Sequence, residues 1–156
     1  MLSAMQKPEL QAYNLGEHEQ RPWGSYKVIG LGTDENGENF CQKEIVVQKG
    51  QILSLQSHQH RRETWTVKKG ILIVILEDKR FSLSEGETIQ IPLHAIHCMA
   101  NGGSEPCIVH EKQIGLCSED DIIRYVDAYG RSTMKLDARS QASADIYNAV
   151  KQEIRA

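Results

Sequence analysis

The sequence predicts an all-β fold, an antiparallel sandwich or barrel, with short helices only at its C-terminal end. Short strand-like segments follow one another closely between Tyr26 and Ile114, separated by turn signals rich in Gly, Pro and Asn. Apolar and polar residues alternate with period two in the longest of these segments, as in strands with one buried face. A helical period is found only near the C-terminus. Many short strands followed by a late helix are typical of a sandwich or barrel.

The composition is that of one globular domain. The chain has 156 residues, of which 40% are hydrophobic and 25% are charged, and this suffices for a single core. A net charge of −3, with both signs interspersed, argues against nucleic acid as a partner. No apolar run is long enough to span a membrane and no signal-peptide pattern is found, so we expect no membrane association and a cytoplasmic location. The four cysteines lack CxxC spacing, which predicts reduced thiols rather than disulfides.

The chain is expected to lead from a polar arm into the barrel. Residues 1–20 carry few large apolar side chains, and we expect a flexible arm there. We expect the barrel at residues 21–117 and a helical extension at residues 118–156. Within the barrel, Tyr26–Leu31 is the first predicted strand and Phe40–Gln48 is the next.

Lys43 lies in the second predicted strand, on the same face as Ile45 and Val47. If this face forms the core, Lys43 is an inward-pointing ammonium group, which seldom occurs without a partner or a function. If the opposite face forms the core, Lys43 is an ordinary surface lysine. The alternation of the strand favours neither orientation.

The segment between Gly50 and Gly70 combines a polar row with an apolar one. The polar row, at every second position, consists of Ser54, Gln56, His58 and His60. Side chains two residues apart in a strand share a face, so these groups would lie together. A turn at Arg61-Arg62 and a returning strand would bring Glu63 beside the histidines. Nitrogen and oxygen donors that converge on one point suit a divalent transition metal.

The later strands are short and regularly spaced. They are predicted at Ile71–Leu76, Phe81–Leu83, Glu87–Ile91, Ile96–Ala100 and Pro106–Ile114. Because Ile71–Leu76 is apolar on both faces, we expect cover on two sides, from C-terminal helices or from a second subunit, and we expect a homodimer. Two helices are predicted, Glu119–Val126 behind the capping residue Ser118, and Ala142–Ile154.

Two glycine-framed motifs resemble those of the cupin superfamily of small jelly-roll barrels. The first motif, with Gln in place of its first His, is matched by Gly50, Gln56, His58, Glu63 and Gly70. The second, with His at the usual turn glycine, is matched by Gly86, Pro92, His94, His97 and Asn101. Two spaced motifs that match together are a specific signal. The resemblance implies a cupin jelly-roll barrel, which is a double-stranded β-helix.

Further segments resemble the type II mannose-6-phosphate isomerases, cupins often found as the C-terminal part of bifunctional mannose-1-phosphate guanylyltransferase/isomerase proteins. They are RPWGSY at 21–26, LSLQSHQHRRETW at 53–65, IPLHAIH at 91–97, HEKQIG at 110–115 and EDDIIRYVDAYGR at 119–131. No segment resembles the nucleotidyltransferase part, so we expect only the isomerase half. The resemblance implies a sugar phosphate as the partner molecule and the interconversion of mannose 6-phosphate and fructose 6-phosphate.

The cupin motif also implies a divalent metal, with zinc as the first choice. Its ligands by motif position are Gln56, His58, Glu63 and His97. The rival pair His58-x-His60 leaves fewer residues before Glu63 than the motif allows, so we place His60 at the mouth of the pocket. The alternative is a polar cupin pocket that no longer binds metal.

Catalytic and substrate-binding roles are implied by the same resemblance. An aldose–ketose isomerisation needs a group that moves a proton between two carbons, and the unranked candidates are Lys43, His60 and Glu111. Substrate contacts are expected from Ser54 and from Arg131, whose guanidinium matches a phosphate group. Two other functions stay open: a non-catalytic metal- or sugar-binding cupin, and an iron-dependent oxygenase, which Gln56 disfavours.

Overall fold

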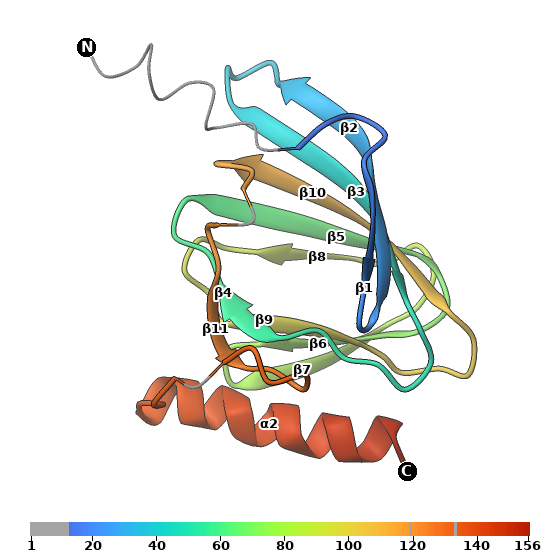
Figure 1. The fold of residues 1–156 in the computed structure, drawn as a ribbon, viewed down its shortest axis with the longest axis vertical. Helices are drawn as coiled ribbons and strands as arrows, with labels where there is room; N and C mark the ends of the chain where they lie inside the picture. The colour runs from blue at the N-terminus through green and yellow to red at the C-terminus, as the bar shows by residue number, and fades with distance from the viewer. Residues whose placement is uncertain (1–12, 119, 133) are drawn as a thin grey trace.

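The strands of the protein form two antiparallel sheets that face each other (Figure 1). This computed structural model describes residues 13–118, 120–132 and 134–156. The six-stranded sheet has the order β1 (His18–Arg21), β2 (Gly24–Thr33), β3 (Asn39–Val47), β10 (Cys107–Gly115), β5 (Arg61–Lys69) and β8 (Thr88–Ile91). The five-stranded sheet has the order β11 (Ile123–Val126), β4 (Leu55–Ser57), β9 (His97–Asn101), β6 (Leu72–Leu76) and β7 (Lys79–Leu83). The predicted all-β jelly roll is confirmed.

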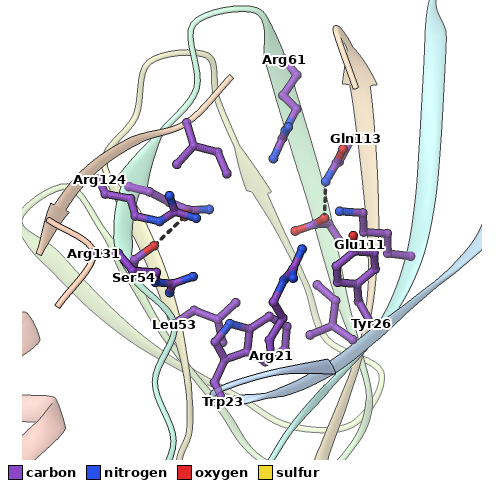
Figure 2. A pocket seen from close by; sticks show the side chains of 14 residues that line it. Arg21, Trp23, Tyr26, Leu53, Ser54, Arg61, Glu111, Gln113, Arg124 and Arg131 are labelled. Carbon is purple, nitrogen blue, oxygen red and sulfur yellow. Dashed lines mark hydrogen bonds between the residues drawn. The ribbon is translucent and has the colours of Figure 1, made fainter. Parts of the chain in front are cut away.

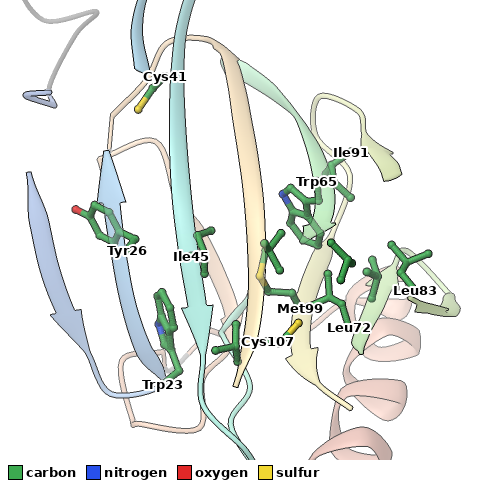
Figure 3. Close-up of a cluster of buried hydrophobic side chains, with 14 of the residues drawn as sticks. Trp23, Tyr26, Cys41, Ile45, Trp65, Leu72, Leu83, Ile91, Met99 and Cys107 are labelled. Carbon is green, nitrogen blue, oxygen red and sulfur yellow. The ribbon is translucent and has the colours of Figure 1, made fainter. Parts of the chain in front are cut away.

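The main core lies between the two sheets, where alternate residues of each strand point inward (Figure 3). Trp65 and Ile45 come from the six-stranded sheet, and Leu72 and Met99 come from the five-stranded sheet. Every second residue of β3 is buried, and Lys43 is among them with 4% exposure. The strand therefore turns the Lys43 face inward, which settles the orientation that the sequence left open.

A second core fills the space between the outer face of the five-stranded sheet and the helix α2 (Ala138–Ile154) (Figure 1). Ile73 and Ile75 of β6 pack in the same cluster as Tyr147 and Val150 of the helix. The intervening side chains of β6 face the main core instead, which explains why this strand is apolar on both faces. Cover on the outer side thus comes from α2 of the same chain. A homodimer stays a prediction.

The helix α2 confirms the predicted C-terminal helix and begins earlier than the apolar pattern indicated. Asp137 is its N-cap, and its carboxylate accepts a hydrogen bond from the backbone N–H of Ser140 in a capping box. In the part of the chain that the structure describes, no helix is both long and apolar enough to cross a membrane.

The helix predicted at Glu119–Val126 is wrong. Ile123–Val126 forms the strand β11, which pairs antiparallel with β4, while residue 119 lies outside the described residues. Ser118 caps a turn instead of a helix, because its Oγ accepts from the backbone N–H of Asp120. The β-branched and aromatic residues of this segment favour a strand once a free edge of the sheet is available to pair with.

The start of the chain differs in part from the flexible arm predicted at residues 1–20. Residues 1–12 of that arm lie outside the described residues. Tyr13 itself is packed, because its ring is buried and lies 6.3 Å from that of Tyr26, centroid to centroid. The strand β1, which begins at His18, pairs with β2 and so extends the sheet by one strand.

Candidate active site

Three potential metal ligands meet between the two sheets. Glu63 lies on β5, His97 begins β9, and His58 directly follows β4. All three side chains are buried, and one ligand atom from each lies within 4.8 Å of the other two. Pairing of β4 with β9 places the two histidines side by side, and the facing sheet supplies the carboxylate. The structure therefore brings together three of the four predicted metal ligands at one point.

The orientation of the two imidazole rings is fixed by backbone carbonyl groups. His58 Nδ1 lies 2.6 Å from the carbonyl oxygen of Asp121, and His97 Nδ1 lies 2.9 Å from that of Ala95. A carbonyl oxygen only accepts hydrogen bonds, so each Nδ1 carries the proton and each Nε2 presents a lone pair. This is the outer-shell arrangement typical of metal-binding histidines.

His97 presents a nitrogen lone pair to the cluster that no protein group engages among the described residues. Its Nε2 is buried and has no hydrogen-bond partner among the described residues. Burial lowers the pKa of His97 to about 4, so the ring is neutral at physiological pH. A buried lone pair without a partner is costly unless a cation or a donor group satisfies it.

Glu63 supplies the negative charge of the cluster. Arg61 Nε donates to its Oε2 over 2.9 Å, and Trp65 Nε1 donates to its Oε1 over 2.9 Å. Burial acts to raise the pKa of Glu63, but the Arg61 guanidinium beside it holds that pKa well below the ordinary value, so the group is a carboxylate. One carboxylate and two imidazole lone pairs fit a divalent transition metal.

Gln56, the fourth predicted ligand, lies beside this cluster at the wall of a cavity. Its Oε1 accepts a hydrogen bond from Ser54 Oγ over 2.7 Å, and its Nε2 lies 3.5 Å from His58 Nε2. Rotating the amide by half a turn exchanges its oxygen and nitrogen, and would aim the oxygen at the cluster. Gln56 is therefore within reach of a ligand role, which stays a prediction.

The cavity adjoins the cluster and is lined by residues of both sheets (Figure 2). It encloses about 520 Å³, including the part that is open to solvent. Its basic lining side chains are Arg21, Lys43, Arg61, Arg124 and Arg131, and its acidic one is Glu111. This excess of positive charge in a concave site favours an anionic ligand. Ser54 and Arg131, the predicted substrate contacts, both line it.

Glu111 and Lys43 are the two predicted acid–base groups that reach the cavity. Gln113 Nε2 donates to Glu111 Oε1 over 2.6 Å. Burial and the nearby charge of Glu63 raise the pKa of Glu111 to about 7, so its carboxyl group can exchange a proton near neutral pH. Lys43 Nζ lies 3.9 Å and 4.1 Å from the ring centroids of Tyr13 and Tyr26.

His60 does not join the other candidates. Its side chain is exposed and is not among the residues that line the cavity. The strand β4 ends at Ser57, so the alternation that aligned His60 with Gln56 does not continue that far. The backbone N–H groups of Gln59 and His60 donate instead to the two carboxylate oxygens of Asp121, which holds this segment as a turn.

Arg61 is the site residue that was missed in the sequence. The sequence predicts a turn at Arg61-Arg62, yet Arg61 starts β5 and is only 4% exposed. It shares a face with Glu63 and Trp65, so the period-two alternation carried a signal for its inward position. Gln113 is a further cavity residue, and its spacing of two from Glu111 on one strand carried the same kind of signal. Arg124 also lines the cavity, but it falls in the segment predicted as a helix.

Comparisons with known proteins agree with this fold and give the family. A family model described as "Mannose-6-phosphate isomerase C-terminal" matches residues 9–127. The chain is 42% identical over 113 residues to the alginate biosynthesis protein AlgA of Pseudomonas aeruginosa, covering 72% of this chain and 22% of AlgA. It is 39% identical over 124 residues to the mannose-1-phosphate guanylyltransferase of Escherichia coli, covering 74% of this chain and 25% of that protein. The chain thus spans about a quarter of the length of these relatives.

Solved structures with low sequence identity share the fold. An RmlC-like cupin from Shewanella frigidimarina superposes with a TM-score of 0.55 at 18% identity, covering 70% of this chain and 95% of that one. The capsular polysaccharide assembling protein CapF from Staphylococcus aureus gives a TM-score of 0.60 at 15% identity, covering 75% of this chain and 34% of CapF. These likenesses show a cupin fold. Together with the family match over residues 9–127, they show that this chain belongs to the mannose-6-phosphate isomerase C-terminal family.

Proposed function

We propose that this chain is a metal-dependent isomerase domain that interconverts mannose 6-phosphate and fructose 6-phosphate. The observation that carries the proposal is a buried cluster of one carboxylate and two imidazole lone pairs beside a basic cavity. The cavity also holds Glu111, a carboxyl group with a pKa of about 7. Membership of the mannose-6-phosphate isomerase C-terminal family supports the same reaction.

The residues that would hold the metal are Gln56, His58, Glu63 and His97. Bound there, a divalent ion, zinc by preference for these donors, would supply Lewis acidity for the carbonyl and the adjacent hydroxyl group of the sugar. The protein contributes the fixed imidazole orientations and an enclosure that limits access of water. Trp65 contacts two of these residues, because its ring packs against His97 while its Nε1 donates a hydrogen bond to Glu63.

Glu111 is the proposed base. It takes the proton from C2 of the aldose as the electron pair of that C–H bond forms the C1–C2 double bond and O1 gains a proton. Return of a proton from Glu111 to C1, with loss of the proton from O2, gives the ketose. A carboxyl group with a pKa near the working pH suits both directions of this transfer. Lys43, opposite Glu111, is placed to donate hydrogen bonds to the oxygen atoms involved.

The phosphate group of the substrate is proposed to lie at Arg131. Its guanidinium is held by Asp127, which accepts hydrogen bonds from Arg131 Nε and Nη2 over 2.8 Å and 2.9 Å. This ion pair fixes the orientation of the guanidinium, which faces the cavity. A guanidinium carries five N–H donors, more than the two that Asp127 engages, so Arg131 can bind Asp127 and a phosphate together. Ser54 is the proposed hydroxyl contact of the sugar.

The experiment that tests the proposal is an isomerisation assay of the zinc-loaded chain with mannose 6-phosphate, beside a chelated sample. We expect formation of fructose 6-phosphate that chelation abolishes and zinc restores. Absence of turnover by a chain that holds zinc would contradict the proposed reaction. Binding of a sugar phosphate without turnover would then support the non-catalytic sugar-binding cupin.

A further inference from the structure

The guanidinium of Arg61 lies directly against two of the proposed metal ligands. Its Nε donates to Glu63 Oε2 over 2.9 Å, and its Nη2 lies 3.2 Å from His58 Nε2. The third arm, Nη1, donates to the carbonyl oxygen of Ser118 over 2.7 Å. All three arms of a guanidinium that is 4% exposed are therefore engaged.

His58 can serve only one partner at its Nε2. Because Nδ1 donates to the carbonyl oxygen of Asp121, Nε2 carries the single in-plane lone pair of the ring. That lone pair accepts from Arg61 in the arrangement seen here. The same lone pair is the one that a metal ion at this cluster would need.

Glu63 is less restricted than His58. Its Oε2 faces Arg61 and lies 3.2 Å from His58 Nε2, whereas its Oε1 faces Trp65 and lies 3.8 Å from His97 Nε2. One oxygen can thus remain with Arg61 while the other serves a metal. The competition between guanidinium and metal is sharpest at His58. It is strengthened by repulsion between a dication and a permanent cation in a buried site.

We propose that Arg61 is an internal competitor for the metal site and sets its affinity. Metal binding displaces the Nη2 arm of Arg61 from His58 toward the cavity, which Arg61 already lines. The cavity then gains a guanidinium donor for an anion, so binding of metal and of anionic ligand is positively coupled. This inference rests on the metal site of the proposed function but not on the isomerase reaction.

Zinc affinity of three proteins, measured by calorimetry after chelation, tests the proposal. Removal of a group that orients a metal ligand usually weakens metal binding by about 10- to 100-fold. Because Arg61 instead occupies the lone pair of His58, we expect Arg61→Ala to bind zinc more tightly than the unmodified chain, by about the same factor. Arg62→Ala is the matched control, because Arg62 is the neighbouring arginine but is exposed and paired with Glu38. Its zinc affinity should equal that of the unmodified chain. Equal or weaker zinc binding by Arg61→Ala would overturn the proposal.

Chemical rescue separates competition from a merely structural role of Arg61. In Arg61→Ala, guanidinium ion at millimolar, non-denaturing concentration should refill the vacated space and weaken zinc binding again. Urea, a neutral molecule of similar shape, should have no effect, and neither compound should alter the zinc affinity of Arg62→Ala. Zinc binding by Arg61→Ala that is indifferent to guanidinium would contradict the competition.

Two further outcomes keep the inference apart from the proposed function. If Arg61→Ala fails to fold, Arg61→Lys retains the charge but cannot reach all three acceptors, and it should still bind zinc more tightly than the unmodified chain. If the unmodified chain binds zinc and both Arg61 variants bind it with the same affinity, the proposed competition is wrong but the metal site stands. Absence of zinc binding in every variant would remove the metal site as well.

Discussion

Glu111 and Lys43 are direct partners across the β10–β3 strand pair, and both line the cavity while almost fully buried. Directly opposed residues of an antiparallel pair project to the same face, so the carboxyl and ammonium groups share one environment. The raised pKa of Glu111 shows that burial and the charge of Glu63 outweigh the attraction of Lys43. Glu111 is thus poised to exchange a proton near neutral pH.

Replacement of this carboxyl group should abolish most of the proposed activity. We expect Glu111→Gln to lower kcat by about 10²- to 10⁴-fold, because the amide cannot take the substrate proton. In the unmodified chain, kcat/KM should rise with pH through about 7 as Glu111 ionises. Steady-state assays across this pH range provide the measurement. Glu44→Gln, which alters a half-buried carboxylate on the opposite face of β3, away from the cavity, is the control and should behave like the unmodified chain.

The same group should make the stability of the chelated protein depend on pH. The pKa of Glu111 is about 7 in the folded protein, against an ordinary value of 4.5, so the folded state keeps a proton that the unfolded state loses between these values. The unfolded state then binds fewer protons, and the free energy of unfolding falls as pH rises from about 4.5 to 7. Urea titrations should show that Glu111→Gln lacks this contribution. An identical pH dependence in both proteins would contradict it.

Local alternation in the sequence was sufficient for part of the site. Period-two patterns predicted Glu63 beside the histidines and left Lys43 either inward or exposed. Motif spacing identified His97 as a metal ligand. The same patterns failed where a strand ended early. His60 follows the polar row in sequence, but β4 stops at Ser57 and Asp121 holds the next residues as a turn.

The other positions that the sequence did not predict depend on contacts between distant parts of the chain. Arg61 is buried because Glu63 and Ser118 accept its hydrogen bonds, and Ser118 is remote in sequence. Ile123–Val126 is a strand because β4 offers it an edge, although its apolar spacing also fits a helix. Intrinsic preference is weak compared with such tertiary pairing.

Zinc should stabilise the protein through the His97 lone pair. At a zinc concentration of about 100 times Kd, the unmodified chain should gain about 2.7 kcal/mol in the free energy of unfolding. His97→Ala removes the buried donor atom, so most of this gain should disappear in thermal denaturation with and without zinc. His18→Ala, an exposed histidine on β1, should retain the full gain. Equal gains in the two variants would place the zinc elsewhere.

The predicted homodimer can be tested independently of the reaction. Static light scattering at micromolar concentration should give twice the 17.6 kDa mass of the chain. A monomer mass would contradict the homodimer and would agree with α2 as sufficient cover for the five-stranded sheet.

The packing of α2 on the five-stranded sheet should contribute strongly to stability. Ile75 is 1% exposed and lies in the core cluster that includes Tyr147 and Val150. Ile75→Ala should lower the free energy of unfolding by about 2–5 kcal/mol, through lost burial and the cavity that it leaves. Ile71, just before the same strand, is 42% exposed, and Ile71→Ala should change the free energy of unfolding by less than about 0.5 kcal/mol. Urea denaturation of both variants measures these changes. Similar losses of unfolding free energy would mean that packing of α2 on the outer face of the five-stranded sheet contributes little to stability.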